Sequence, residues 1–177
     1  MSFPEQIQTE RLVLRWPVEG DVEEIFTRYA SDPEVTRYLS WAPHRSVSDT
    51  LAFYLERAAE REQHGKVFNW LVFIRGGALV GSIGCQVEQH TVTFGYCYAR
   101  DAWGRGYATE AARALVPAWL AEPSVWRVQA YCDLENIASA RVLEKAGLTR
   151  EGTLRKHLVA PNLSDVPRDV YCYAKVR

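Results

Sequence analysis

The sequence has little net charge of either sign and no long apolar run. It contains 21 lysines and arginines against 22 aspartates and glutamates, and the basic residues do not gather into a run. These features disfavour nucleic acid and an anionic membrane surface as partners. No stretch has the pattern of a signal peptide or the length of a membrane span, so we expect a cytoplasmic protein with no membrane partner.

Cysteine and histidine are both scarce, and neither shows the spacing of a metal site. The cysteines are scattered, each in a strand-like run, at Cys85, Cys97, Cys132 and Cys172. Because no Cys-x-x-Cys pair is present, we expect buried free thiols in a reducing compartment. The histidines, which also lack ligand spacing, are His44, His64, His90 and His157. No metal is therefore expected.

The chain also lacks the residues that mark two common nucleotide-binding loops. A P-loop needs Gly-Lys-Ser/Thr, and the glycine-rich turn at residues 104–106 has no such sequence. A dinucleotide-binding loop needs a third small residue where Thr109 stands, and an acidic residue about twenty positions later. Glu122 is too close for that role and Asp133 is too distant. The turn therefore fits neither class.

What is present suffices for one ordinary domain. The chain has 177 residues, 47% of them hydrophobic, which is enough to bury a full core without disulfides or metals. Internal repeats, low-complexity segments and linkers are not evident. We expect a single domain over residues 1–177.

The most informative stretch predicts a strand, a glycine turn and a helix. Residues 91–98 alternate with β-branched and aromatic side chains, as in a half-buried strand. Gly104 and Gly106 then precede a helix whose apolar stripe comprises Ala108, Ala111, Ala112, Leu115, Ala118 and Trp119. The start of such a helix exposes backbone N–H groups at the positive end of the helix dipole, so we expect an anion to bind there.

The rest of the chain alternates between strand and helix patterns. Strands are predicted at residues 7–15, 68–74, 79–88, 125–132, 148–154 and 170–176. Helices are predicted at residues 22–30, from the Ser46 cap to Gly65, and at residues 136–146 before Gly147, with a loop at 32–45. Pro117 predicts a kink or an early end in the central helix.

The pattern Trp103-x-x-Gly106-x-Ala108, with Gly104, Arg105, Tyr107 and Thr109, resembles the pyrophosphate-binding motif of the GNAT (GCN5-related N-acetyltransferase) superfamily. Together with Thr9-Glu10-Arg11-Leu12 it is similar to the RimJ/RimL-like branch. The resemblance implies an α/β (α+β) fold. It further implies a mostly antiparallel twisted sheet of about seven strands, about four helices, and acetyl-CoA at a splayed strand pair.

The same resemblance assigns residues to the cofactor. Backbone amides from Gly104 to Thr109 would hold the pyrophosphate of acetyl-CoA, and the strand end before them would pair with the pantetheine amides. The full set that it assigns to the cofactor is Tyr98, Ala99, Arg100, Trp103, Gly104, Arg105, Gly106, Tyr107, Ala108, Thr109, Asn136 and Ser139.

Asn136-x-x-Ser139, with Lys145, Gly147 and Leu148 after it, resembles the second motif of the family. In relatives the Asn touches the pantetheine arm and the Ser can protonate the leaving thiolate. The alternative is structural, with Asn136 an ordinary N-cap and Ser139 its partner three residues on. Both roles can hold together.

The general base is the least defined part of the predicted site. Many relatives carry a Glu where this sequence has Thr93, which cannot accept a proton near neutral pH. His157 could deprotonate the amine, because imidazole titrates near neutral pH. Glu88 and solvent are the other candidates. A backbone amide near Cys97 or Tyr98 is expected to donate a hydrogen bond to the oxyanion.

The resemblance implies an acetyl-CoA-dependent N-acetyltransferase that acts on a primary amine, either a protein N-terminus or a small molecule. Direct transfer is favoured, since nothing near Cys97 suggests a stabilised thiolate. A non-catalytic acyl-CoA-binding module is the alternative, and the chain is expected to be a monomer or homodimer. Aromatic residues that could line an acceptor pocket, although most are expected in the core, are Tyr38, Trp41, Trp70, Tyr96, Tyr98 and Tyr171.

Overall fold

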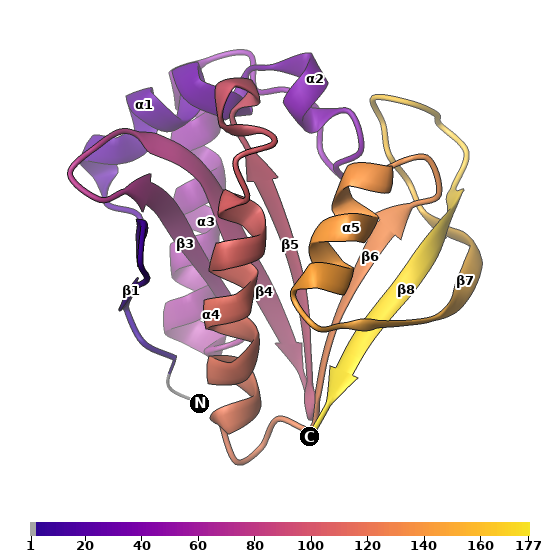
Figure 1. Cartoon of the computed structure of the whole chain (residues 1–177). Coiled ribbons are helices and arrows are strands. Elements are labelled where there is room, and N and C mark those ends of the chain that lie inside the picture. The colour runs from indigo at the N-terminus through magenta and orange to yellow at the C-terminus, as the bar shows by residue number, and fades with distance from the viewer. Residues whose placement is uncertain (1–2) are drawn as a thin grey trace.

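The computed structural model describes residues 3–177 and contains one sheet of eight strands. The strands lie in the order β1-β2-β3-β4-β5-β6-β8-β7 (Figure 1). Their bounds are β1 Gln6–Gln8, β2 Leu12–Arg15, β3 Val67–Ile74, β4 Leu79–Glu88, β5 Thr91–Tyr98, β6 Arg127–Asp133, β7 Thr149–Leu158 and β8 Arg168–Val176. Neighbouring strands are antiparallel except β5 and β6, which are parallel. The predicted α/β class with a mostly antiparallel sheet is confirmed.

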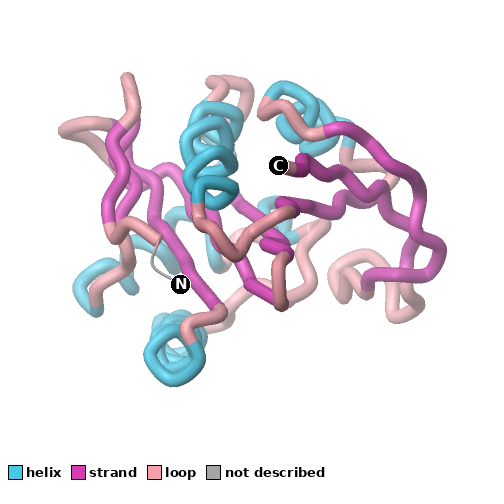
Figure 2. Tube along the Cα trace, turned by 90° about the horizontal axis from the view of Figure 1, so that it is seen from below, coloured by secondary structure: helices cyan, strands magenta, loops and turns pink. Residues whose placement is uncertain are grey.

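Helices cover both faces of this sheet. Their bounds are α1 Val22–Ile25, which continues as a π-helical segment over Phe26–Ala30, α2 Pro33–Thr36, α3 Val47–His64, α4 Tyr107–Ala121 and α5 Ile137–Lys145. Figures 1 and 2 show α4 and α5 on one face and α3 on the other. Within residues 3–177, no helix lies on the sheet face over β6, β8 and β7 opposite α5 (Figure 2).

Two elements differ from the prediction and account for the extra strand and helix. The strand predicted at residues 7–15 is wrong, because the chain turns back at Thr9 to form the β1–β2 hairpin. The Thr9 N–H donates to Leu12 O at 2.9 Å, and the Leu12 N–H donates to Thr9 Oγ1 at 3.0 Å. Within the predicted loop 32–45, Asp32 caps α2 by accepting from the Glu34 N–H, with Pro33 in the first turn.

Of the kink or early end predicted at Pro117, the early end is wrong, since α4 runs on to Ala121, and the kink stays a prediction. Pro117 lies on the exposed face of α4, where its ring displaces no core side chain. The opposite face is held by burial: Val116 and Trp119 are fully covered. Tertiary packing therefore outweighs the local cost of the proline.

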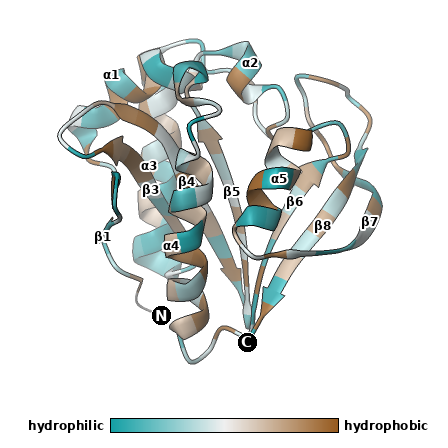
Figure 3. Cartoon of the chain, viewed as in Figure 1, coloured by the Kyte–Doolittle hydropathy of each residue, from teal (hydrophilic) through white to brown (hydrophobic). Residues whose placement is uncertain are grey.

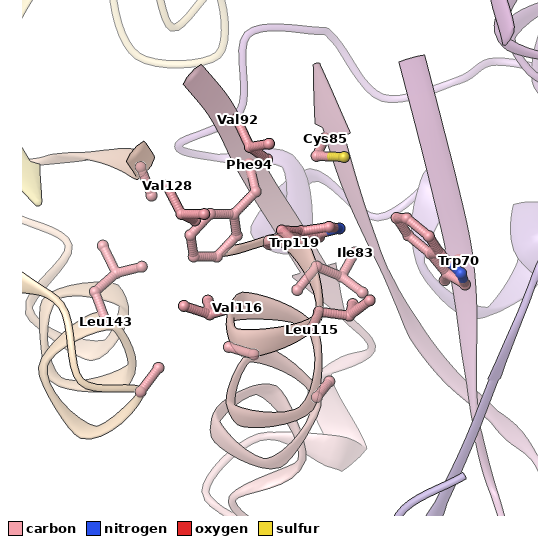
Figure 4. Close-up of a cluster of buried hydrophobic side chains, with 14 of the residues drawn as sticks. Trp70, Ile83, Cys85, Val92, Phe94, Leu115, Val116, Trp119, Val128 and Leu143 are labelled. Carbon is pink, nitrogen blue, oxygen red and sulfur yellow. The ribbon is translucent and has the colours of Figure 1, made fainter. Parts of the chain in front are cut away.

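The main core lies between α4 and the sheet. Figure 4 shows Trp119, Leu115 and Val116 directed from α4 toward Phe94, Ile83 and Trp70. Trp119 lies 5.2 Å from Phe94 and 6.0 Å from Trp70, measured between ring centroids. Figure 3 shows the outer surfaces of the helices as largely hydrophilic. The apolar stripe predicted for this helix is thus the one that packs on the strands.

The feature that positions the site is the short contact between β5 and β6. These two strands pair only through Thr91 with Arg127, Val92 with Val128 and Thr93 with Gln129. Beyond Thr93 they diverge, and Figure 1 shows a V-shaped opening flanked by α4 and α5. This opening is the splayed strand pair expected from the sequence.

Candidate functional site

The edge of β5 presents backbone groups to the opening. The Ala99 N–H donates to Val80 O of β4 at 2.9 Å. Because successive residues of a strand direct their backbone groups to opposite edges, the N–H groups of Tyr96 and Tyr98 point toward β6. A ligand that carries amides can add to such an edge as a strand would.

The glycine turn leads from β5 into α4 with its backbone accessible. Gly104 has φ 73° and Gly106, the N-cap of α4, has φ 80°; both are left-handed values that suit glycine. Residues 103–106 are exposed and residues 107–109 are half-buried. The first turn of α4 is therefore accessible to solvent, and the anion expected at its amides stays a prediction.

Trp103 fixes the end of β5 beside this turn. Its side chain is half exposed, and its indole Nε1 donates to Tyr98 O at 2.7 Å. The carbonyls of Ala99 and Arg100 accept from the N–H groups of Ala102 and Trp103 in the following turn. The carbonyls of residues 98–100 are thus engaged within the protein, and the Tyr98 N–H is the group that this segment presents to a ligand.

Ser139 lies where α5 faces the opening. Asn136 caps α5, because its side-chain oxygen accepts from the Ser139 N–H at 3.1 Å, so the structural alternative holds. The Ser139 hydroxyl also lies 2.8 Å from the hydroxyl of Tyr96 on β5. The sequence predicted Tyr96 only as a pocket or core residue. Its position two residues before Tyr98 places both side chains on the same face of β5, toward α4 and α5, and this spacing could have assigned Tyr96 to the site.

Burial controls the ionisation of the groups around the opening. It raises the pKa of Tyr96 well above the usual tyrosine value, so the phenol stays protonated at neutral pH. It also raises the pKa of Cys97 to about 11, and the hydrogen bonds with Ser82 offset this only in part. Cys97 is therefore a poor nucleophile.

On the other face of the sheet, polar side chains connect β5 with β6. Gln129 Nε2 donates to Thr93 Oγ1 at 3.0 Å and to the Tyr131 hydroxyl at 2.8 Å, while Arg127 Nε donates to Gln129 Oε1 at 2.7 Å. The exposed His157 ring of β7 lies 4.6 Å from the Tyr131 ring. This face therefore brings His157 to the same side as Thr93.

Glu88, the other predicted base, lies at the opposite end of the sheet. It pairs with Thr91, where β5 and β6 are still joined, and accepts from Gln86 Nε2 at 3.1 Å. Of the predicted aromatic pocket residues, Trp70 and Tyr98 are buried in the core.

A side chain that sequence reasoning missed joins the loop between β7 and β8 to α2 and the segment after it. Asn162 Nδ2, in the loop between β7 and β8, donates to Thr36 O at 2.6 Å and to Trp41 O at 2.9 Å. The bond joins segments more than 120 residues apart in sequence. No local pattern marks such a contact.

Residues 3–177 show neither a metal site nor a membrane-spanning helix. No group of three or more His, Cys, Asp or Glu side chains in that range is arranged to hold a metal ion. None of the helices in the same range combines the length and apolarity that crossing a membrane requires. All four cysteines are free thiols.

Comparison with known proteins gives consistent matches. A family model described as an acetyltransferase (GNAT) domain matches residues 11–149. The uncharacterized N-acetyltransferase p20 of Bacillus licheniformis is 27% identical over 157 residues, which cover 86% of this chain and 87% of p20. A GNAT-family acetyltransferase structure from Bacillus anthracis is 30% identical with a TM-score of 0.83, covering 97% of this chain and 98% of that chain.

A further solved structure carries the coenzyme itself. It is RimL, a ribosomal L7/L12 α-N-protein acetyltransferase in complex with coenzyme A, with a TM-score of 0.86 at 21% identity. The match covers 97% of this chain and 98% of RimL. At this identity the likeness extends to the fold alone.

Proposed function

The chain belongs to the GNAT acetyltransferase family, and on that premise we propose how and where it works as an acetyl-CoA-dependent N-acetyltransferase. The acetyl group passes directly from the thioester to a primary amine in the opening between β5 and β6. One observation carries this proposal: an exposed helix start, the Tyr98 N–H and the Ser139 hydroxyl all border the same opening.

The coenzyme lies between α4 and α5. The amides of residues 104–109 hold its diphosphate, because backbone donors and the helix dipole both favour negative charge there. Its pantetheine arm runs along the β5 edge, where the amides of Tyr96 and Tyr98 point. Asn136 contributes its side-chain amide from the α5 side. These positions bring the thioester to the opening.

The chemistry is one displacement with a tetrahedral intermediate. A C–N bond forms as the neutral amine attacks the thioester carbonyl, and the Tyr98 N–H donates to the oxygen that gains charge. The C–S bond then breaks, and the thiolate takes a proton from Ser139, which regains one from solvent, while the proton that the amine loses passes to solvent. No acetyl-cysteine forms, since the pKa of Cys97 is raised to about 11 by burial.

The amine loses its proton on the opposite face of the sheet. We assign this step to His157, directly or through water, because its ring lies against Tyr131 on the face that also carries Thr93. Thr93 has no proton-accepting group suited to neutral pH. The acceptor therefore approaches from the face opposite α4 and α5.

The acceptor class proposed is a primary amine, either a protein N-terminus or a small molecule. RimL, which shares the fold, is an α-N-protein acetyltransferase. We also place the enzyme in the cytoplasm, a proposal supported by its four free thiols.

The test is coenzyme A release, followed with a thiol reagent, over a panel of amino acids, polyamines and short peptides. Replacement of Ser139 by alanine is expected to lower kcat by about 100-fold or more, because one positioned general acid contributes roughly 10²- to 10⁴-fold, with KM for acetyl-CoA unchanged within twofold. Coenzyme binding without turnover of any amine would favour a binding module instead. An isolable acetyl-enzyme would contradict direct transfer.

A further inference from the structure

The turn between β1 and β2 is hydrogen-bonded to the first turn of α4 through the carboxylate of Glu110. Glu110 Oε1 accepts from Thr9 Oγ1 at 2.5 Å and from the Arg11 N–H at 2.9 Å. Its Oε2 accepts from Arg11 Nε at 2.6 Å. Residues about a hundred positions apart in sequence therefore meet at the helix end where the coenzyme diphosphate is placed.

The Arg11 guanidinium extends past Glu110 to the glycine turn itself. Its Nη1 donates to Arg105 O at 3.0 Å, and its central carbon lies 4.9 Å from the centre of the Tyr107 ring. Its Nη2 is 3.5 Å from the position that a Cβ on Gly106 would occupy. One side chain thus contacts Arg105 and Tyr107, the residues on either side of Gly106.

Arg11 also offsets the negative charge of Glu110. Burial favours a raised pKa for Glu110, but the bonds from Thr9 and Arg11 outweigh it and lower the pKa, so the carboxylate is ionised at neutral pH. A lone anion in the first turn of α4 would repel a diphosphate bound there. Arg11 balances it, and because the Arg11 side chain is 47% exposed, its positive charge remains accessible to a ligand.

From these contacts we infer that Arg11 is a positioning residue for the coenzyme diphosphate. It holds the turn at residues 104–107 so that the amides converge before the coenzyme arrives, and it cancels the charge of Glu110. This inference rests on the coenzyme site proposed above.

The primary test compares acetyl-CoA with S-acetylpantetheine, which lacks the diphosphate. Arg11→Met is expected to weaken the calorimetric Kd for acetyl-CoA by about tenfold or more, a size typical of a lost charge-assisted contact. Both kcat at saturation and kcat/KM for S-acetylpantetheine should stay within twofold. Equal losses with the two donors would show a general structural role and overturn the inference, as would an unchanged Kd for acetyl-CoA.

Two further variants sharpen this test. Arg15→Met removes a guanidinium from β2 that pairs with Asp21 instead, and should leave the Kd for acetyl-CoA unchanged. Adding Glu110→Gln to Arg11→Met removes the uncompensated anion, so the double variant should bind acetyl-CoA more tightly than Arg11→Met alone. A weaker double variant would contradict the charge argument. Failure of the unsubstituted protein to bind coenzyme would instead refute the proposed function.

Discussion

The hydroxyl groups of Tyr96 and Ser139 lie 2.8 Å apart across the opening, and this contact bears on where the serine proton points. Burial keeps Tyr96 protonated by raising its pKa. The single phenol hydrogen of Tyr96 can go to Ser139 O at 3.2 Å or to Ser139 Oγ at 2.8 Å. When it goes to Oγ, the serine hydrogen is free to point into the opening toward sulfur. The phenol would then also stabilise the oxygen as its proton leaves.

Tyr96→Phe is therefore expected to lower kcat by about tenfold, less than the roughly 10²-fold or more of a direct general acid because Tyr96 acts through Ser139, with KM for acetyl-CoA unchanged. Tyr173→Phe is the matched control, because the Tyr173 hydroxyl also bonds α5, through Glu144 Oε1 at 3.0 Å, without contacting Ser139. Steady-state kinetics of the two variants make the comparison. Equal losses would mean that the bond only anchors α5, and the role in orienting the proton would be abandoned.

At this scale the sequence predicted the local contacts and missed the distant ones. Asn136 and Ser139 are three residues apart, so their cap followed from spacing. The bond between Tyr96 and Ser139 spans 43 residues, and it depends on how far β5 and β6 diverge. No local pattern carries that information.

At the scale of elements, the pairing of β4 with β5 requires that position 81 carry no side chain, as Gly81 does not. A Cβ on Gly81 would lie 2.4 Å from Cys97 O and 2.7 Å from Tyr98 Cδ1, closer than atoms can approach. A Cβ on Gly95, two residues before Cys97 on the same strand, would have no atom within 4 Å. The two glycines form a natural pair for comparison.

Gly81→Ala is expected to lower the free energy of unfolding by about 1–3 kcal/mol, as overpacked substitutions do, and to raise KM for acetyl-CoA by displacing the Tyr98 N–H. Gly95→Ala should leave the unfolding free energy within about 0.5 kcal/mol. Urea unfolding and acetyl-CoA saturation curves measure both effects. If Gly95→Ala proves as damaging as Gly81→Ala, crowding at Tyr98 is not the cause.

Element prediction succeeded where signals were local. The helix from Ser46 to Gly65 follows from reciprocal Ser46–Asp49 capping and from Gly65 at φ 60°. The first strand was predicted too long because its alternating pattern continues through Thr9, whereas the Thr9 side chain closes a turn. Pro117 failed as a stop signal because burial of its helix outweighs local propensity.

At the scale of the whole molecule, the sheet consists of two parts joined by three residue pairs. The strands from β1 to β5 form one part and the strands from β6 to β8 the other. Arg113 Nε on α4 also bonds Lys145 O at the end of α5, at 2.8 Å. A ligand bound between α4 and α5 would contact both parts at once.

Acetyl-CoA should therefore raise the melting temperature. At a hundredfold excess over Kd, the linkage relation gives about 2.7 kcal/mol, which corresponds to about 5–10 °C for a chain of this size. ATP with magnesium should give no shift, since the turn lacks P-loop residues. Differential scanning fluorimetry decides the matter, and a shift with ATP equal to that with acetyl-CoA would refute a coenzyme-specific site.

In the proposed mechanism the coenzyme binds on the α4 and α5 face of the diverging strands β5 and β6, and the amine approaches from the other face. Each substrate can then bind and leave from its own face of the sheet without displacing the other. Binding from separate faces imposes no compulsory order of addition. Direct transfer in a complex of both substrates predicts that double-reciprocal plots at several fixed concentrations of the second substrate intersect. The spent thiol and the acetylated product would likewise depart in opposite directions.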